Sequence, residues 1–375
     1  MKFLFVANVL RNENTGTAGH IIHLARAIDK KGHTARTFFR DDLFTGIKYS
    51  IPLNITVFLS FPLIAAFKIF YSDFQNDYDF IIISSGDGFL YALLKKMVFF
   101  KKKPLIIMRS HGYEYLYKEE LEIEKRFNNH SYFTLKERIF LFGFRLIQVR
   151  VFSYLCDSIF TLNNNEKVYL EKIYPNKRIF AVPVGIDPIF MSPDTEVSRS
   201  RDILFVGGWT RLKGWVYLVK IIDRLNKGKS DLAVSILGTG VNDKYVLAEF
   251  SDSTRDRIRV IKFLPKNMLK KEYLSHKVFL FPSLFEGYGN VILEAMAAGM
   301  VVVVSKGLGA TENIIDGYNG FLVEKRDVDG FVKTVEKILG DEAVMKEIGK
   351  NAERSVKHMT WDNIAERVIK NCKEI

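Results

Sequence analysis

Short runs of apolar residues alternate along the chain with segments of helical periodicity. In the first half the apolar runs are residues 2–9, 79–84, 104–108 and 158–162. Between the first two, apolar residues repeat every three or four positions over residues 20–31, and Gly32 follows as an expected helix end. Continuous apolar runs are typical of strands buried on both faces, so the alternation predicts a parallel sheet covered by helices.

The second half repeats the pattern. Its apolar runs are residues 202–208, 233–238, 259–263, 278–281 and 300–304. A proline-containing segment and a polar stretch, together residues 179–202, separate the halves. We therefore expect an α/β protein of two Rossmann-like doubly wound domains, 1–187 and 188–359, facing a central cleft. A helix at about 360–375 is expected to pack back on the first domain.

Composition fits two globular domains. The chain has 375 residues, of which 48% are hydrophobic and 26% charged, enough to form a core in each half. The two cysteines, Cys156 and Cys372, lack metal-ligand or redox spacing, which favours a reducing compartment. The apolar start of the chain is interpreted as a buried strand rather than a signal peptide, and we expect a cytoplasmic protein.

The formal net charge of +12 serves solubility in the simplest interpretation and indicates an anionic partner in the more specific one. Basic and large apolar residues are mixed in two stretches, a pattern that suits an anionic membrane surface better than a nucleic acid. The basic residues concerned are Lys95, Lys96, Lys101, Lys102, Lys103, Arg138, Arg145 and Arg150. Residues 51–67 carry no charge, but two prolines and marginal length favour a buried or membrane-lying helix over a membrane span. No module that binds nucleic acid is evident.

The most specific pattern follows the apolar run that ends at Phe281. A glycine-punctuated loop carries Glu286 and opens a helix near Asn290, and Glu294 lies one turn into that helix. Backbone N–H groups at a helix start favour anionic or hydroxyl-rich ligands, and glutamates accept hydrogen bonds from paired sugar hydroxyls. Taken alone, either glutamate would more often be part of an ordinary strand–loop–helix joint with one exposed acid.

The two glutamates, seven residues apart and followed by Ala295-Met296-Ala297-Ala298-Gly299, resemble the signature of retaining GT-B glycosyltransferases. The segments 24–33 and 311–323 resemble two further conserved runs of that family, in the same order. The resemblance thus covers nearly the whole chain. It implies a GT-B fold and retaining transfer of a hexose or related sugar from a UDP- or GDP-linked donor to a glycan or lipid-linked acceptor.

The resemblance also implies roles for individual residues. Glu294 matches the glutamate that binds the donor ribose, and Glu286 matches the one that contacts the transferred sugar. Gly16 matches a glycine beside the diphosphate, and His111 matches a histidine near the reacting sugar. The loop whose backbone touches sugar and phosphate corresponds to Gly287, Tyr288, Gly289 and Asn290.

The glycine turn at 207–214 resembles the phosphate-binding turn of the family. Lys213 falls on the family lysine, whereas the usual arginine positions hold Gly208 and Leu212, so Arg211 is the nearest substitute. A departing diphosphate gains negative charge, and a fixed Arg–Lys pair would stabilise it. The alternative is a solvated turn. Other departures, such as Val184 where asparagine is common, lie on the acceptor side.

Three polar residues complete the candidates. His111 follows an apolar strand at the end where open sheets bind ligands, and Glu114 lies three residues later. A lone histidine there is more often a structural donor. Asp327 and Asp329 form an Asp-x-Asp pair, which we interpret as a helix start rather than a metal site, so no metal or other cofactor is expected.

Two other classes remain open beside the transferase. One is a binding module for nucleotide sugars or polysaccharides that lacks catalysis, and the other is a GT-B sugar-nucleotide epimerase. The intact glutamates favour the transferase. No pair of carboxylates like that of retaining hydrolases is evident, which favours front-face attack with the leaving phosphate accepting the acceptor proton. The resemblance suggests a role in cell-surface polysaccharide, glycolipid or glycoconjugate synthesis.

Overall fold

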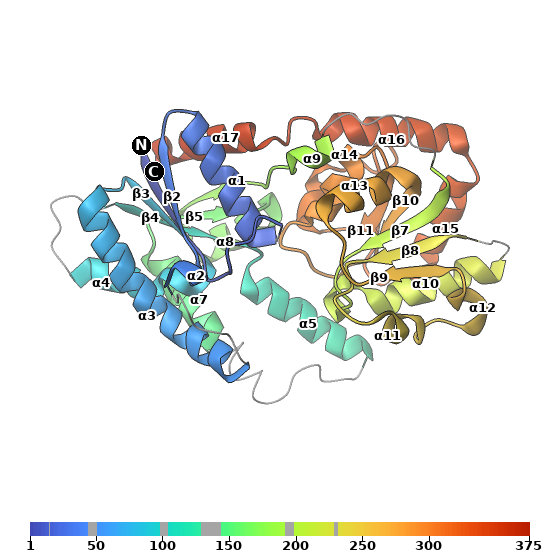
Figure 1. The fold of residues 1–375 in the computed structure, drawn as a ribbon, viewed down its shortest axis with the longest axis horizontal. Helices are drawn as coiled ribbons and strands as arrows, with labels where there is room; N and C mark the ends of the chain where they lie inside the picture. The colour runs from blue at the N-terminus through green and yellow to red at the C-terminus, as the bar shows by residue number, and fades with distance from the viewer. Residues whose placement is uncertain (15, 44–50, 98–103, 129–143, 192–198, 229–231) are drawn as a thin grey trace. The chain divides into compact units, whose positions relative to one another are not determined.

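The computed structural model describes residues 1–375 except 15, 44–50, 98–103, 129–143, 192–198 and 229–231. The chain divides into two compact units, shown in Figure 1. One comprises Met1–Gly185 together with Trp361–Ile375, and the other comprises Ile186–Thr360. The division thus falls within two residues of each boundary expected from the sequence.

The N-terminal unit is built on a parallel six-stranded sheet with the order β2-β1-β3-β4-β5-β6. Its strands are β1 (Lys2–Val6), β2 (Thr34–Phe38), β3 (Phe80–Ser84), β4 (Leu105–Arg109), β5 (Ser158–Thr161) and β6 (Arg178–Ala181). Every residue of β3 and β5 is buried, as expected for strands covered on both faces. The candidate residues of this unit follow two other strands: Gly16 comes after β1, and His111 and Glu114 come after β4.

Helices cover both faces of this sheet. They are α1 (Gly16–Lys30), α2 (Arg40–Leu43), α3 (Ile51–Asn76), α4 (Phe89–Met97), α5 (Glu114–Asn128), α7 (Leu146–Leu155), α8 (Asn164–Ile173) and α17 (Trp361–Glu374), with the short helix η1 (Ser85–Gly88). On one face, α3, α4 and α7 enclose a core with Phe61, Tyr91 and Phe152 at its centre. The C-terminal helix α17 packs against α1 within this unit.

The C-terminal unit has a second parallel six-stranded sheet, with the order β12-β11-β10-β7-β8-β9. Its strands are β7 (Arg201–Val206), β8 (Val234–Leu237), β9 (Ile258–Ile261), β10 (His276–Phe281), β11 (Val301–Ser305) and β12 (Phe321–Val323). Strands β8 and β9 are added on the side of β7, and strands β11 and β12 on the side of β10, so the strand order reverses between β7 and β10. Ligands of open α/β sheets bind at such a switch point, beyond the carboxyl ends of the strands.

The helices of this unit connect the strands. They are α9 (Pro188–Met191), η3 (Arg211–Lys213), α10 (Trp215–Gly228), α11 (Asp243–Leu247), α12 (Asp252–Arg255), α13 (Lys266–Ser275), α14 (Asn290–Ala297), η4 (Gly309–Asn313), α15 (Val328–Leu339) and α16 (Glu342–Val356). With both sheets parallel and covered by helices, the predicted α/β class is confirmed.

Several sequence expectations need correction in detail. The edge strands β2 and β12 were not expected, because the TARTF sequence of β2 is polar and β12 has three residues. Residues 51–67 form part of α3, which continues through Pro62 to Asn76. Among the residues that the structure describes, no helix combines the length and the apolar character needed to cross a bilayer.

Candidate functional site

The loop between β10 and α14 carries most of the candidate residues of the C-terminal unit. Gly289 caps α14 with φ 96°, a conformation that L side chains rarely adopt, so a glycine is required there. Asn290 then begins the helix. The left-handed turn directs the chain from the loop with Glu286 and Gly287 into a helix whose first N–H groups face outward.

The turn after β7 is joined tightly to this loop. Gly214 has φ 74°, and a Cβ atom there would lie 1.9 Å from the carbonyl oxygen of Pro282. The carbonyl of Leu212 accepts hydrogen bonds from the N–H of Leu284 at 2.7 Å and from the hydroxyl of Ser283 at 2.9 Å. The backbone thus holds η3 and the glutamate loop side by side in a fixed register.

This register brings Lys213 to Glu286. The ammonium nitrogen Nζ lies 2.6 Å from Oε1 and 2.7 Å from Oε2 of the carboxylate. The hydroxyl of Ser283 also donates to Oε1 at 2.9 Å, which orients the acid. The Glu286 side chain is 9% exposed and that of Lys213 is 31% exposed. Glu286, expected to contact the sugar, and Lys213, expected to contact the diphosphate, are therefore within hydrogen-bonding distance of each other.

Arg211 lies beside two tryptophans that the sequence analysis did not single out. Its guanidinium lies over the ring of Trp215, 5.5 Å from the centroid, and Trp209 stacks on Trp215 with the centroids 5.4 Å apart. Both basic residues of the turn thus lie on η3, but only Lys213 reaches Glu286 in the described structure. Stacking on Trp215 gives Arg211 a preferred orientation.

Glu294 is held by a residue that sequence reasoning missed. The hydroxyl of Tyr273, a fully buried side chain on α13, donates to Oε2 of Glu294 at 2.9 Å. Burial raises the pKa of Glu294 to about 7, while the hydrogen bond from Tyr273 and the charge of Lys266 act in the opposite direction. Lys266 in turn pairs with Asp187 at 2.6 Å. The carboxyl group therefore titrates near neutral pH.

Tyr288 and Asn313 link the glutamate loop to η4. Tyr288 is buried, its carbonyl accepts from the N–H of Ala310 at 2.6 Å, and its hydroxyl accepts from Asn313 at 3.4 Å. Asn319 stabilises the same run by bonding the backbone of Ile315 and Asn313. The run at 311–323, which resembles a segment of the family, therefore supports the loop that carries Glu286.

In the N-terminal unit, His111 lies just beyond β4, as its position after an apolar strand predicted. Its Nε2 atom lies 3.0 Å from the hydroxyl of Ser84, at the end of the neighbouring strand β3. Burial, followed by the charges of Arg109 and Arg145, lowers the pKa of His111 to about 3. The imidazole is therefore neutral at physiological pH and can exchange hydrogen bonds with a hydroxyl group.

Arg109 is itself unusual. It is 2% exposed, and its three guanidinium nitrogens have no hydrogen-bond partner among the described residues. Burial lowers the pKa of Arg109 to about 10. Its charge adds to the larger effect of burial in lowering the pKa of His111.

Glu114 and Arg145 form a partly buried network beside His111. Arg145 lies 2.7 Å from Asp87 and 3.3 Å from Glu114, and Glu114 also accepts from the hydroxyl of Ser85. The sequence analysis assigned Arg145 to a basic surface, which is wrong, because its side chain is only 13% exposed and is neutralised by two carboxylates. Glu114 is thus bonded to Arg145 and helps to orient it.

Lys95 requires a similar correction. It is 8% exposed, and its ammonium group donates to the carbonyl of Pro104 and lies 3.5 Å from Asp157. It therefore caps the core rather than contributing surface charge. Residues 101–103 and Arg138 lie outside the described residues, whereas Lys96 and Arg150 are exposed as expected.

Gly16 is the first residue of α1, and a Cβ atom there would meet nothing within 4 Å. The fold itself therefore does not require a glycine at this position. Gly19, by contrast, packs closely, since its Cβ would lie 2.5 Å from the carbonyl oxygen of Glu13. The open space at Gly16 is compatible with close approach of a ligand to the helix start.

The Asp-x-Asp pair lies at the start of α15. Asp327 caps the helix by accepting from the N–H of Gly330 at 2.9 Å, and Asp329 pairs with Arg224. Within the described ranges, no cluster of three or more histidine, cysteine or acidic side chains has the spacing of a metal site. The role expected of Asp327 as a helix cap is observed directly.

Comparison with known proteins gives matches to glycosyltransferases. Residues 190–355 match the family described as "Glycosyl transferases group 1". An uncharacterized glycosyltransferase of Methanocaldococcus jannaschii is 34% identical over 210 residues, covering 52% of this chain and 54% of that protein. CapM of Staphylococcus aureus, a capsular polysaccharide biosynthesis glycosyltransferase, is 36% identical over 86 residues, or 23% of each chain. The chain therefore spans about half the length, or less, of these two relatives.

Solved structures resemble the whole chain at low sequence identity. Sucrose-phosphate synthase from Thermosynechococcus elongatus superposes with a TM-score of 0.76 at 15% identity, covering 100% of this chain and 99% of that one. Anabaena HepE in complex with UDP superposes with a TM-score of 0.69 at 13% identity, covering 100% of both chains. At such identities the likeness establishes the fold.

Proposed function

We propose that the chain is a group 1 glycosyltransferase, which the match of residues 190–355 and the fold of its structural neighbours support, and that it transfers a sugar from a nucleoside diphosphate to an acceptor hydroxyl with retention of configuration. The observation that carries this proposal is the contact between Lys213 and Glu286, at 2.6 and 2.7 Å. It places a cation and a hydroxyl acceptor at one point beyond the carboxyl ends of β7 and β10. A sugar diphosphate needs both groups at that point.

The donor would bind in the C-terminal unit. Glu294 accepts hydrogen bonds from the ribose hydroxyls, with Tyr273 fixing its orientation through Oε2. Glu286 accepts from hydroxyls of the transferred sugar, and the N–H groups at the start of α14 face the phosphate side. HepE, a structural neighbour, has been crystallised with UDP and with UDP-glucose, which supports a donor of this class.

Lys213 would stabilise the leaving group. When the bond from the anomeric carbon to the phosphate oxygen breaks, the diphosphate gains negative charge, and a preorganised cation stabilises that charge most in the transition state. Because Lys213 is 31% exposed and paired with a single carboxylate, its ammonium group can share its hydrogens with the diphosphate. Arg211, oriented by Trp215, would supply a second cation. These cations remove the need for a metal ion.

Retention follows from attack on the face that the diphosphate leaves. The acceptor oxygen bonds to the anomeric carbon, and its proton passes to a leaving phosphate oxygen on the same face. Within the C-terminal unit, Glu286 is engaged with Lys213 and Ser283, which favours a binding role over that of a nucleophile. His111, kept neutral by burial and by Arg109, would bind a sugar hydroxyl near the reaction centre.

The acceptor is proposed to be a glycan or a lipid-linked hydroxyl compound in cell-surface polysaccharide or glycoconjugate synthesis. The likeness to CapM, named for capsular polysaccharide biosynthesis, supports this pathway class. We place the reaction in the cytoplasm. A binding module without catalysis and an epimerase share the fold, and the intact glutamates favour the transferase.

A panel of nucleotides tests the donor assignment. UDP, GDP and their hexose conjugates are added to wild-type protein and to Glu294→Ala, and the melting temperature and the Kd are measured. One diphosphate should raise the melting temperature of the wild type. Glu294→Ala should weaken its binding by roughly 1–3 kcal/mol, the scale for losing a charged hydrogen-bond partner. Equal affinity of both proteins would remove Glu294 from the ribose site.

A further inference from the structure

One face of the N-terminal unit exposes an array of large apolar side chains. They lie on α3, α4 and α7, and α4 packs against both of the others. We call this the apolar face, and its residues are Leu63, Phe67, Tyr71, Phe74, Leu93, Met97, Ile147, Val151 and Tyr154. Phe74 is 86% exposed and Tyr154 is 71% exposed. Soluble proteins rarely expose contiguous apolar patches of this kind without a partner.

The helical spacing shows that this exposure is systematic. On α7, Ile147, Val151 and Tyr154 recur every three or four residues and face outward, whereas Val149 and Phe152 are buried against the sheet. A helix that only covers a sheet needs a single apolar stripe. The helix α7 has two, and its outer stripe is not buried by the described residues of this unit.

The helix α3 repeats this arrangement. Its buried residues Phe61, Ala65 and Ile69 face the core, and Phe67 and Phe74 face outward. Two charged residues of α3 follow Ser60, and neither interrupts the outward stripe. Asp73 is 7% exposed, and the Lys68 ammonium donates to the carbonyl of Asp42. The outward stripe of α3 is therefore apolar along several turns.

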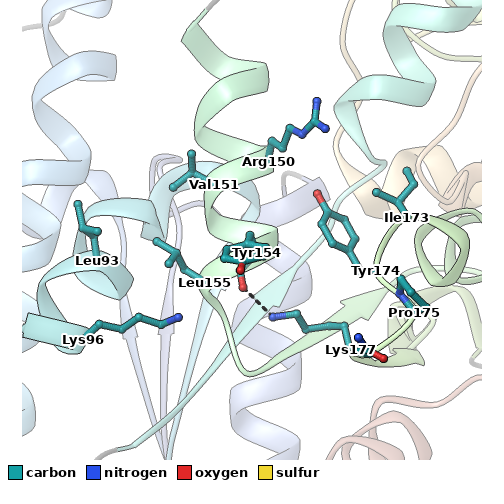
Figure 2. Close-up of a pocket in the computed structure, with 11 residues that line it drawn as sticks. Leu93, Lys96, Arg150, Val151, Tyr154, Leu155, Ile173, Tyr174, Pro175 and Lys177 are labelled. Atoms are coloured by element: carbon teal, nitrogen blue, oxygen red, sulfur yellow. Dashed lines mark hydrogen bonds between the residues drawn. The ribbon is translucent and has the colours of Figure 1, made fainter.

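A cavity of about 890 Å³ opens beside this face, between α4, α7 and the turn that follows α8. Figure 2 shows Lys96, Arg150 and Lys177 around it, with the rings of Tyr154 and Tyr174. The Lys177 ammonium donates to the carbonyl of Tyr154 at 2.9 Å, so this cation is fixed at the cavity. None of the described residues that line the cavity is acidic. The cavity thus combines apolar walls with positive charge.

We propose that the apolar face lies on an anionic lipid bilayer and that the cavity beside it receives a lipid phosphate headgroup. Apolar side chains on neighbouring helices, with cations at the margin, match the two layers of a membrane surface. The aliphatic and aromatic residues enter the boundary between headgroups and acyl chains, and Lys96, Arg150 and Lys177 lie at phosphate level. A nucleic acid would leave the apolar stripes of α3 and α7 exposed to water.

This proposal goes beyond the transferase function and does not depend on it. A vesicle experiment needs neither donor nor acceptor. Nucleotide binding, measured on the same preparations, reports on the C-terminal unit separately. Loss of vesicle binding with unchanged nucleotide affinity, or the reverse, therefore identifies which of the two proposals has failed.

The first experiment is flotation of the full chain with vesicles. Vesicles of phosphatidylcholine alone are compared with vesicles that contain phosphatidylglycerol, at low and at high salt. The protein should float with the anionic vesicles at low salt and lose most of its binding at high salt, because screening shortens the attraction. Absence from anionic vesicles at low salt overturns the proposal.

Charge insertion tests the apolar face. The double variant Phe67→Glu/Ile147→Glu should abolish flotation, since two carboxylates would have to enter the bilayer boundary. The matched control is Tyr245→Glu/Met268→Glu, which adds the same charge at exposed apolar positions of the C-terminal unit. The control should float like the wild type. Melting temperatures should agree within the set, because all four side chains are exposed.

Charge removal tests the cavity. Lys96→Gln/Arg150→Gln should weaken binding by about fivefold per charge, whereas Lys333→Gln/Lys337→Gln on the exposed side of α15 should leave it unchanged. Equal losses in both pairs would mean that net charge alone acts, which rejects the headgroup site. Sedimentation without vesicles gives the remaining outcome. A dimer that Phe67→Glu/Ile147→Glu dissociates would assign the face to a second copy and overturn the membrane proposal.

Discussion

Both units place a cation beside carboxylates beyond the carboxyl ends of their strands, but the two arrangements differ in kind. In the N-terminal unit Arg145 is 13% exposed and pairs with Asp87 and Glu114. In the C-terminal unit Lys213 is 31% exposed and pairs with Glu286 alone. A buried, doubly compensated guanidinium is held in place, whereas a half-buried ammonium can move to a ligand. Position at the end of a sheet therefore does not by itself identify a ligand-binding cation.

Replacing Arg145 should have the largest effect on stability. Arg145→Ala leaves the buried Asp87 and the partly buried Glu114 without their counter-ion, which should lower the free energy of unfolding by about 3–5 kcal/mol. Denaturant titration measures this loss. The matched control is Arg224→Ala, whose pair with Asp329 is exposed and should change stability by less than about 0.5 kcal/mol. Equal stability of the two variants would erase the contrast between buried and exposed pairs.

Lys213→Ala should show the opposite profile. Turnover of the donor should fall by about 10²–10³-fold, the scale for removing one group that stabilises transition-state charge. Its stability should fall less than that of Arg145→Ala, because Lys213 is 31% exposed and Glu286 keeps its hydrogen bond from Ser283. The control Lys306→Ala removes an exposed pair with Glu324, at 3.0 Å, and should retain wild-type turnover. Wild-type turnover in Lys213→Ala would contradict the assignment.

Glu294 is a carboxylate whose hydrogen-bond partner, Tyr273, is neutral, and nucleotide binding should therefore depend on pH. Burial raises the pKa of Glu294 to about 7, so nucleotide affinity should fall as the pH decreases through 7 and the carboxylate binds a proton. Tyr273→Phe removes a hydrogen bond that favours the ionised form, and the midpoint should therefore move to higher pH. Calorimetry between pH 5 and 9 measures the midpoint. A variant that binds more weakly with an unchanged midpoint would give Tyr273 a packing role only.

The raised pKa of Glu294 also makes the stability of the protein depend on pH. The raised pKa means that the folded protein binds a proton on Glu294 more tightly than the unfolded chain does. The contribution of this group to stability is therefore greatest below pH 4.5 and is lost as the pH rises through about 7. Glu294→Gln should reduce this part of the pH dependence in thermal unfolding.

Sequence periodicity predicted the paired doubly wound domains because continuous valine, isoleucine and phenylalanine runs are characteristic of buried parallel strands. It placed Glu286 and Glu294 correctly on a loop and a helix, since glycines and a helix start mark that joint. It could not show that Lys213 meets Glu286, because this contact depends on the close approach of Gly214 to Pro282. It missed Tyr273 because a tyrosine at helical spacing resembles an ordinary core residue in the sequence.

Burial of charged residues was the least predictable property. Lys95 and Lys96 are neighbours in the sequence, yet Lys95 is buried against Pro104 and Lys96 is exposed at the cavity. One helical step separates the two environments, and composition cannot distinguish them. Arg145 and Arg150 differ in the same way, because one faces the buried carboxylates and the other the solvent.

The central claim is metal-independent transfer with retention, and proton NMR of donor turnover tests it most directly. The protein is incubated with the nucleotide sugar that raises its melting temperature, in EDTA, with water as the acceptor. The account predicts release of the nucleoside diphosphate together with free sugar that first appears in the anomeric configuration of the donor. First appearance of the opposite anomer, or turnover that stops when EDTA is added, would contradict it.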